Sequence, residues 1–464
     1  MTSFGDGYDT IGLEGNASFN PVSPTLKDGT AITGDGLTNH DAAVYAVLNP
    51  TPGSEADIEA SLASDNSYDV ARAAQNTLDA ITHLFRLTGD LRLLDRLCDG
   101  YAALEASWGV PWDATLYPHV DYAGRSDQDL CDGAGESDPW SPHPKVVFKQ
   151  SSYWAAGTDL DPLQQTKIYS AMARFAWALH VNRGKTSPGG YNYDTLADTW
   201  GGAIEDHVDT WSGAGAECWR PNYHGDQYNS TYDVKAAWGT YPVLSRNESH
   251  AALATIQLTY YTGRLGDTGL WNIPNPGNAL TKSHDMAASI NNSLVDCAGG
   301  STYGDSIIWS HSSLFTGGTD ESQPATYTGY MAQYWTDLWM SGYFRDVFTA
   351  DRMMKISRAF ANMMDTGSVA AAGDDATLGT IAGGGISCGL NSNWSSSPRT
   401  ARQVVSRGIS TMVAFAPLSE PKLESDSTLV QNVAGGGYTT PEWGVIPAAQ
   451  FVGWALREIG DYTQ

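Results

Sequence analysis

Groups able to move a proton gather in the middle of the chain. Arg246, Asn247 and His250 stand at the head of an apolar segment that predicts a helix, and backbone N–H groups at a helix start attract anions. His311 and Tyr327 follow further along the chain. Together, amide, imidazole and phenol groups could neutralise a carboxylate and remove the proton on the adjacent carbon. This is the chemistry of β-elimination, which cleaves uronic-acid polysaccharides.

Two tyrosines are the main candidates for the group that carries the proton. Tyr327 and Tyr330 are three residues apart, so they share one face of a predicted helix. A phenol with a pKa of about 10 becomes a useful base only when cations or buried neighbours tune it. One phenol could then take the C5 proton of a uronate and return it to the leaving oxygen. We place Tyr327 first, with Tyr330 and Tyr303 as alternatives; aromatic core packing is the competing interpretation.

Lysine and arginine are scarce, so the positions of those that are present indicate where an anion could bind. The segment 285–344 contains no lysine or arginine, and His311 is its one group able to become cationic. Asn247 has a purely structural alternative as the N-cap of the helix that it begins. Tryptophan and tyrosine, at 16 and 23 residues, supply rings that can stack on sugars or fill the core. Further candidates for binding a substrate are Lys149, Asn192, Arg220 and His224.

The charge balance argues against one class of partner and limits another. Acidic residues outnumber basic ones 52 to 26, giving a net charge of −26, which argues against nucleic acid. An acidic polymer would also be repelled unless its binding cleft is locally basic. No run of apolar residues is long enough to span a membrane, and the N-terminus lacks a signal-peptide pattern. We expect an extracellular or periplasmic protein, from a saline environment, whose leader is removed or whose export differs; its oligomeric state is left open.

The five cysteines are widely spaced and form no C-x-x-C pair, so they predict neither a zinc site nor a disulfide-dense scaffold. The segment 127–133 resembles a calcium loop, but its third aspartate is out of register and the closing glutamate is missing. We therefore expect no cofactor, and a structural calcium ion is the alternative that this segment leaves open.

The apolar pattern predicts an all-α protein. Residues 1–66 are rich in Gly, Asn, Pro and Thr and predict an irregular lead-in, whereas 67–464 predict one catalytic domain. Apolar helices that stop at Thr-Gly or Ser-Gly and are followed by a return helix recur along this domain. Such repeated hairpins favour an α/α toroid with long loops around a cleft; an ordinary helical bundle or solenoid is the alternative. The predicted helices are 70–88, 91–108, helices within 148–181, 195–211, 250–261, 327–339, 347–364 and 451–459.

The order of these motifs resembles a known family. His250 on a helix that ends in Tyr260-Tyr261-Thr262-Gly263, then Trp-x-His, then Tyr-x-x-Tyr, is similar to the α/α-toroid polysaccharide lyases. The nearest resemblance is to the alginate and glucuronan lyases of polysaccharide lyase family 38, over about residues 67–364. It implies metal-independent β-elimination with tyrosine as base and acid. Under it, His250 would be the family histidine, Tyr327 the tyrosine, and Asn192 or Asn247 the asparagine.

The chain departs from the family pattern at one point. An arginine is expected shortly before the tyrosine, and none is present. Arg246 or His311 would have to bind the carboxylate in its place, or the tyrosine is Tyr303.

Two other classes of function remain open. The first is an inverting glycoside hydrolase on the same toroid, which needs two carboxylates about 6.5–9.5 Å apart. Its candidate residues are Asp194, Asp198, Glu205, Asp226 and Asp233. The second is a non-catalytic carbohydrate-binding or viral surface protein. Elimination alone creates a conjugated double bond, so ultraviolet absorbance separates the lyase from the hydrolase.

Overall fold

The computed structural model describes part of the chain, and the account below concerns that part. It comprises residues 78, 81–82, 85, 90–107, 162–212, 220–221, 231–232, 249–273, 275–297, 305–308, 334–335, 337–339, 341–356, 393–394 and 397–398. These residues are mostly helical, 73% by number, as the sequence predicts. They fall into two compact units, one formed by Leu78 with 97–287 and the other by 81–96 with the residues from 288 onward. The predicted lead-in, 1–66, and the predicted helix 451–459 lie outside the described residues.

Helix α6 (Leu91–Ser107) begins and ends close to the predicted bounds. Asp90 caps its start, because its carboxylate accepts a hydrogen bond of 3.0 Å from the backbone N–H of Arg92. The same carboxylate holds the Arg92 guanidinium at 2.5 Å, and the Asp90 side chain is buried. Asp90 therefore fixes the point at which the helix begins.

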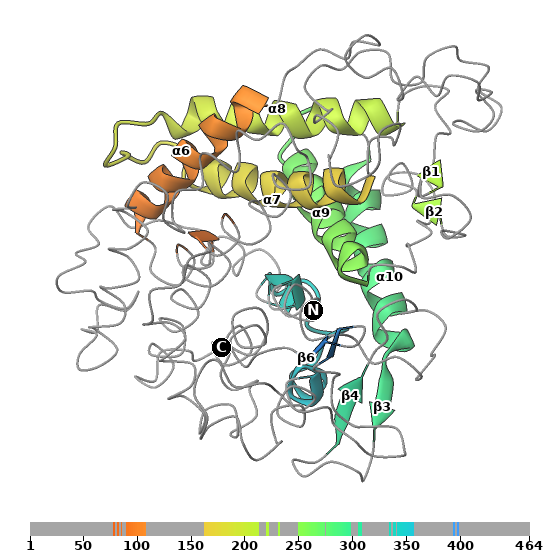
Figure 1. The fold of residues 1–464 in the computed structure, drawn as a ribbon. Helices are drawn as coiled ribbons and strands as arrows, with labels where there is room; N and C mark the ends of the chain where they lie inside the picture. Colours follow the sequence, from red (N-terminus) through yellow and green to blue (C-terminus); the bar gives the residue numbers. More distant parts are fainter. Residues whose placement is uncertain are drawn as a thin grey trace, which may run out of the picture. The chain divides into compact units, whose positions relative to one another are not determined.

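Helices α7 (Pro162–Val181) and α8 (Tyr193–Ser212) form an antiparallel hairpin, shown in Figure 1. Phe175, late in α7, contacts Trp200 with ring centroids 6.0 Å apart. Arg183, just past the end of α7, binds Asp194 at the start of α8. The order of contacts therefore reverses along α8, as in an antiparallel pair. Proline at the first position of α7 is favourable because its missing N–H has no intrahelical partner there.

Helix α9 (Ser249–Asp267) begins where the sequence predicts but continues past its predicted end. Thr262 and Gly263 were expected to stop it, and both lie inside the helix. Gly263 is needed for packing, since an added Cβ would lie 2.9 Å from the side chain of Leu280. The turn instead comes at Gly269, whose φ of 69° lies in the left-handed region that glycine adopts readily. Gly263 therefore allows close packing between helices, and the sequence pattern was wrong in predicting a helix end there.

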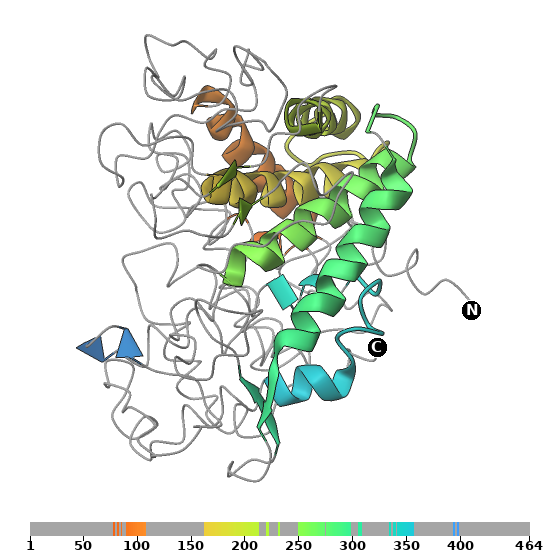
Figure 2. The same cartoon turned by 90° about the vertical axis from the view of Figure 1, so that its right-hand side faces the viewer.

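Helix α10 (Pro276–Ser293) was not predicted from the sequence. Its apolar positions are sparse, and Ala279, Met286 and Ile290 supply most of its buried face. It runs back along α9, because Pro276 lies against Gly266 and Leu280 against Gly263. Figures 1 and 2 both show the two helices side by side.

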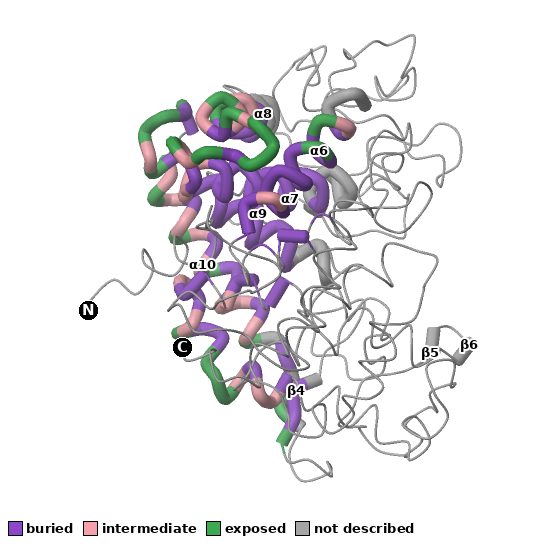
Figure 3. The backbone as a smooth tube through the Cα atoms, turned by 90° about the vertical axis from the view of Figure 1, so that its left-hand side faces the viewer, coloured by how far each residue is buried: buried purple, intermediate pink, exposed green. Residues whose placement is uncertain are grey.

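The two hairpins are joined through α7 and α9, which run parallel to each other. The Ser170 hydroxyl donates a 2.7 Å hydrogen bond to Gln257, and the Arg264 guanidinium lies 5.1 Å from the Trp177 ring centroid. The second contact is seven residues further along both helices, which requires a parallel arrangement. Described side chains of α7 and α9 are buried almost all round, whereas α8 and α10 each expose one face (Figure 3). Two inner helices are therefore each followed by an antiparallel outer helix.

Aromatic rings form the core where α6 meets the first hairpin. Tyr101 of α6 stacks on Phe175 of α7, with centroids 4.0 Å apart and rings nearly parallel at 4°. Trp200 of α8 meets both rings edge-on. Burial raises the pKa of the Tyr101 phenol well above its usual value of about 10, so it remains neutral.

The other unit contains helical residues and a β-hairpin. The predicted Ser341-Gly342 stop is confirmed, since Gly342 has a φ of 77°. The return helix starts at residue 350 rather than at Val347, and Thr349 caps it through the backbone N–H of Arg352 at 3.2 Å. Strands β3 (Val295–Cys297) and β4 (Ser306–Ile308) pair antiparallel. The Arg352 guanidinium ties this hairpin to α10 by binding Asp296 and the backbone oxygen of Asn291, each at 2.9 Å.

Short antiparallel pairs complete the described strands. They are β1 (Arg220–Pro221) with β2 (Thr231–Tyr232), and β5 (Asn393–Trp394) with β6 (Ser397–Pro398). Within the described part of the chain, no helix combines the length and the apolar character that crossing a membrane requires.

Candidate functional site

Three of the predicted site residues lie in the described part of the chain. His250 is in the first turn of α9, which begins at Ser249, and this is where the sequence placed it. Arg220 lies in β1, and Asn192 directly precedes α8. The remaining candidates lie outside the described residues: Lys149, His224, Arg246, Asn247, Tyr303, His311, Tyr327 and Tyr330. The segment 127–133, considered for calcium, lies outside them as well.

Asn192 caps α8. Its side-chain oxygen accepts a 3.1 Å hydrogen bond from the backbone N–H of Thr195, and its backbone oxygen accepts one of 3.0 Å from Leu196. The neighbouring Tyr191 donates its phenol hydrogen to Asp99 of α6, while Tyr193 is buried. Asn192, which the resemblance proposed as one candidate for the family asparagine, thus has a structural role as a helix cap.

Charges are unevenly divided between the inner helices α7 and α9 and the outer helix α8. The inner helix α7 carries Lys167 and Arg174 and no acidic residue. The inner helix α9 carries Arg264, with Asp267 as its last residue. The outer helix α8 carries no lysine or arginine, and its acidic residues are Asp194, Asp198, Glu205, Asp206 and Asp209. In a chain of net charge −26, the inner pair of helices is thus locally basic.

The inner-helix cations of α7 are buried. Lys167 is 7% and Arg174 1% exposed. Arg174 lies four residues after Ser170 and three before Trp177, so all three share the face of α7 that packs on α9. These cations were missed at the sequence level, because an isolated lysine or arginine in an apolar helix gives no sign of which face is covered.

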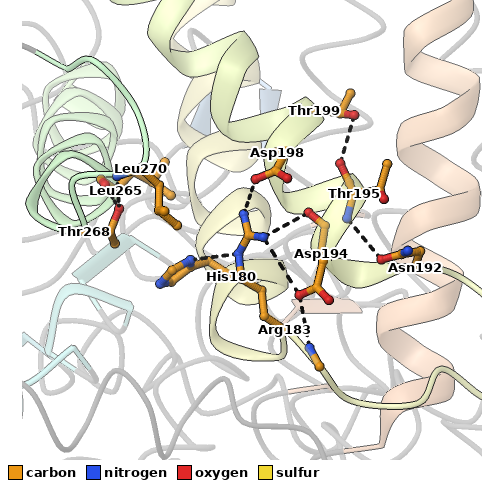
Figure 4. Close-up of polar contacts among 11 residues, drawn as sticks. His180, Arg183, Asn192, Asp194, Thr195, Asp198, Thr199, Leu265, Thr268 and Leu270 are labelled. Carbon is orange, nitrogen blue, oxygen red and sulfur yellow. Dashed lines mark hydrogen bonds and ion pairs between the residues drawn. The ribbon is translucent and has the colours of Figure 1, made fainter.

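A cluster of charged and aromatic side chains closes the C-terminal end of the inner pair. It consists of His180, Arg183, Asp194, Asp198 and Trp271, and we refer to it as the helix-end cluster (Figure 4 shows its polar members). It joins the end of α7, the start of α8 and the connection between α9 and α10.

Arg183 organises the helix-end cluster. Its Nε donates to Nδ1 of His180 at 3.2 Å, and Nη1 donates to the backbone oxygen of Asp194 at 3.2 Å. Its Nη2 binds the carboxylate of Asp198. The guanidinium also lies 5.7 Å from the ring centroid of Trp271. One side chain therefore fixes the turn between α7 and α8 at several points.

His180 lies between two indoles. Its ring stacks on Trp177 at a centroid distance of 5.2 Å and meets Trp271 edge-on at 5.6 Å. Partial burial lowers the pKa of His180 first, and the charge of Arg183 lowers it further, while Asp198 opposes both. The neutral ring accepts from Arg183 at Nδ1, so its hydrogen is assigned to Nε2. In this state its Nδ1 is occupied and is not available as a general base.

Asp194 and Asp198 were candidates for a hydrolase pair. Both belong to α8, and both bind the guanidinium of Arg183. Asp194 also accepts a 3.1 Å hydrogen bond from the backbone N–H of Gly184. The two carboxylates therefore act together in holding a turn. Glu205 is partly exposed further along α8, and Asp226 and Asp233 lie outside the described residues.

Trp271 is seated directly on a glycine of α8. An added Cβ at Gly201 would lie 2.1 Å from Cε2 of Trp271, whereas at Gly202 it would meet nothing within 4 Å. We expect Gly201→Ala to lower the free energy of unfolding by about 1–3 kcal/mol, because the indole is confined by His180 and cannot move away freely. Gly202→Ala is the matched control and should be stabilising by about 0.5–1 kcal/mol through helix propensity. Urea unfolding of both variants measures the difference, and equal stabilities would contradict this seating of Trp271.

The helix-end cluster was not found from the sequence. His180 and Arg183 are three residues apart at a helix end, and Asp194 and Asp198 are four apart at the next helix start. These spacings were a usable signal for a charge clamp across a helical hairpin. Trp271 could not be assigned in this way, because its partners come from a different hairpin.

Comparison with known proteins gives no relative from which a function could be transferred: no protein-family model, curated protein or solved structure matches the chain. Among the described residues, no group of three or more His, Cys, Asp or Glu side chains is arranged to hold a metal ion.

Proposed function

We propose that the chain is an α/α-toroid polysaccharide lyase that cleaves a uronic-acid polymer of the alginate or glucuronan type by β-elimination. The observation that carries the proposal is the division of charge between the inner helices α7 and α9 and the outer helix α8. Lys167, Arg174 and Arg264 lie on the inner pair, and the acidic residues of α8 lie on the outer layer. These cations do not contact a polymer directly, because Lys167 and Arg174 are buried, but they raise the local electrostatic potential, which an acidic protein needs where it binds an acidic polymer.

The helix arrangement supports the toroid. In that architecture, inner helices run parallel around a centre, and each is followed by an antiparallel outer helix. The α7–α8 and α9–α10 hairpins have this order, with α7 and α9 parallel and in contact. The predicted helices 70–88 and 327–339 would be further members of the series in chain order.

His250 supports the proposed location of the active site. It lies in the first turn of the inner helix α9, where backbone N–H groups and the helix dipole favour an anion. A uronate carboxylate placed there would be neutralised by His250, together with Asn247, Arg246 or His311. Neutralisation makes the C5 proton acidic enough for Tyr327 to remove, and the same phenol returns a proton to the leaving oxygen.

The test is a screen of the purified protein on alginate, glucuronan, pectate and glycosaminoglycans. Ultraviolet absorbance of the conjugated double bond and reducing ends are measured on the same samples. A lyase produces both signals in equal amounts. New reducing ends without absorbance would identify a hydrolase, and binding without either signal would identify a carbohydrate-binding protein; each result would overturn the proposal.

A further inference from the structure

The turn between α7 and α8 is held closed by a neutral histidine. Arg183 donates to His180 at Nδ1 over 3.2 Å, and the same guanidinium holds Asp194 and Asp198 of α8. Because Nδ1 is the acceptor, a proton added at this atom removes the hydrogen bond. It also places a second positive charge directly against the guanidinium.

The surroundings of His180 leave it little freedom to respond by turning away. Trp177 stacks on one side of the ring and Trp271 meets it edge-on. Trp271 is itself 7% exposed and lies on Gly201. Protonation must therefore be answered by movement of Arg183 and of the turn that it holds.

We propose that His180 is a pH-dependent latch for the turn between α7 and α8, closed when the imidazole is neutral and released when it is protonated. The charged groups around it come from each packed element. They are Arg183 after α7, Asp194 and Asp198 of α8, and Arg264 of α9, which lies over Trp177. The connection 268–275 contributes no charged residue. Arg183 thus opposes the imidazolium, and both carboxylates are already engaged by Arg183.

The pH range follows from the direction of the shift. The imidazole has an ordinary pKa of about 6.5, and the folded state lowers it. Below about pH 6.5 the unfolded or released state takes up a proton more readily than the latched state does. The stabilising effect of the latch is therefore fully present above about pH 6.5. It is lost as the pH falls through the lowered pKa of His180.

Hydrogen exchange measures the latch directly. The amides of Lys185, Gly190 and Tyr191 are held by bonds within the turn, to Asn182, Ser187 and the Ser187 hydroxyl. After correction for intrinsic exchange rates, we expect their protection to fall by up to about tenfold per pH unit as the pH decreases below about 6.5. Amides in the middle of α9 should show no comparable change. Constant protection of the turn over this range would overturn the proposal.

A variant assigns the effect to His180. His180→Gln keeps a side-chain oxygen for Arg183 but cannot titrate in this range, so the turn should lose its pH response. His284→Gln is the matched control, because it removes an imidazole from the middle of α10 and should leave the response unchanged. A response that persists in His180→Gln would rule out the latch.

A second variant covers the case in which His180→Gln does not fold, as judged by circular dichroism. Asp198→Asn removes the carboxylate that favours the protonated imidazole, so the response should move to lower pH. An unshifted midpoint in Asp198→Asn would contradict the assignment. The proposal concerns the fold of one hairpin and does not depend on the lyase activity.

Discussion

Replacing Tyr327 by phenylalanine is expected to lower the rate of double-bond formation by about 10²–10⁴-fold on a polymer that the parent protein cleaves. The substitution keeps the ring and its packing and removes the one group proposed to move the proton. Folding and binding should be nearly unchanged. Initial rates by ultraviolet absorbance, with thermal unfolding of both proteins, measure the two effects separately.

Tyr330→Phe, at the alternative phenol, is the comparison variant for this prediction. Tyr330 lies three residues after Tyr327 on the same predicted helix face, so a general effect of losing a hydroxyl there would appear in both variants. Near-normal turnover in Tyr327→Phe would rule out the assignment. Tyr303 and Tyr330 would then be tested as the catalytic phenol.

Truncating Trp200 to alanine is expected to lower the free energy of unfolding by about 3–5 kcal/mol. Its side chain is buried, with 2% of the residue exposed, and meets Tyr101 and Phe175 edge-on. The cavity would therefore open where α6, α7 and α8 meet. A loss of this size is a large fraction of the stability of a typical domain, about 5–15 kcal/mol. Urea unfolding followed by circular dichroism measures it.

Leu270→Ala provides the comparison for the truncation of Trp200. Leu270 is 57% exposed in the connection after α9, so removing its side chain should change the stability by less than about 0.5 kcal/mol. A loss for Trp200→Ala as small as that for Leu270→Ala would mean that the aromatic core does not stabilise this unit.

The sequence predicted those helices whose boundary signals are local. Asp90 starts α6 through its own carboxylate, and Asn192 starts α8 in the same way. The start of α9 at Ser249 lies one residue before the predicted start, and His250 lies in the first turn as predicted. In each case the residue types at the boundary determine the structure without help from a distant part of the chain.

Predictions failed where contacts between helices decide the structure. Gly263 lies inside α9 because Leu280 packs against it, although Thr-Gly commonly marks a helix end. Helix α10 was missed because its few apolar residues only become a face when α9 covers them. The contact of His180 with Trp271 was missed for the same reason, because Trp271 belongs to a different hairpin. The chemistry proposed for Tyr327 stays a prediction from the sequence, because that residue lies outside the described part of the chain.

The parallel contact between α7 and α9 has a consequence for the order in which the chain folds. Ser170 and Gln257 are 87 residues apart, whereas Arg183 and Asp194 are 11 apart. Closing the longer loop costs about 2 kcal/mol more in chain entropy, so each hairpin should form before the two dock. During synthesis, the α7–α8 hairpin therefore forms before α9 is available, and one side of α7 stays exposed to solvent until then. Ser170 and Arg174 make that side partly polar. This polarity should limit aggregation until α9, with Gln257 and Arg264, packs against α7.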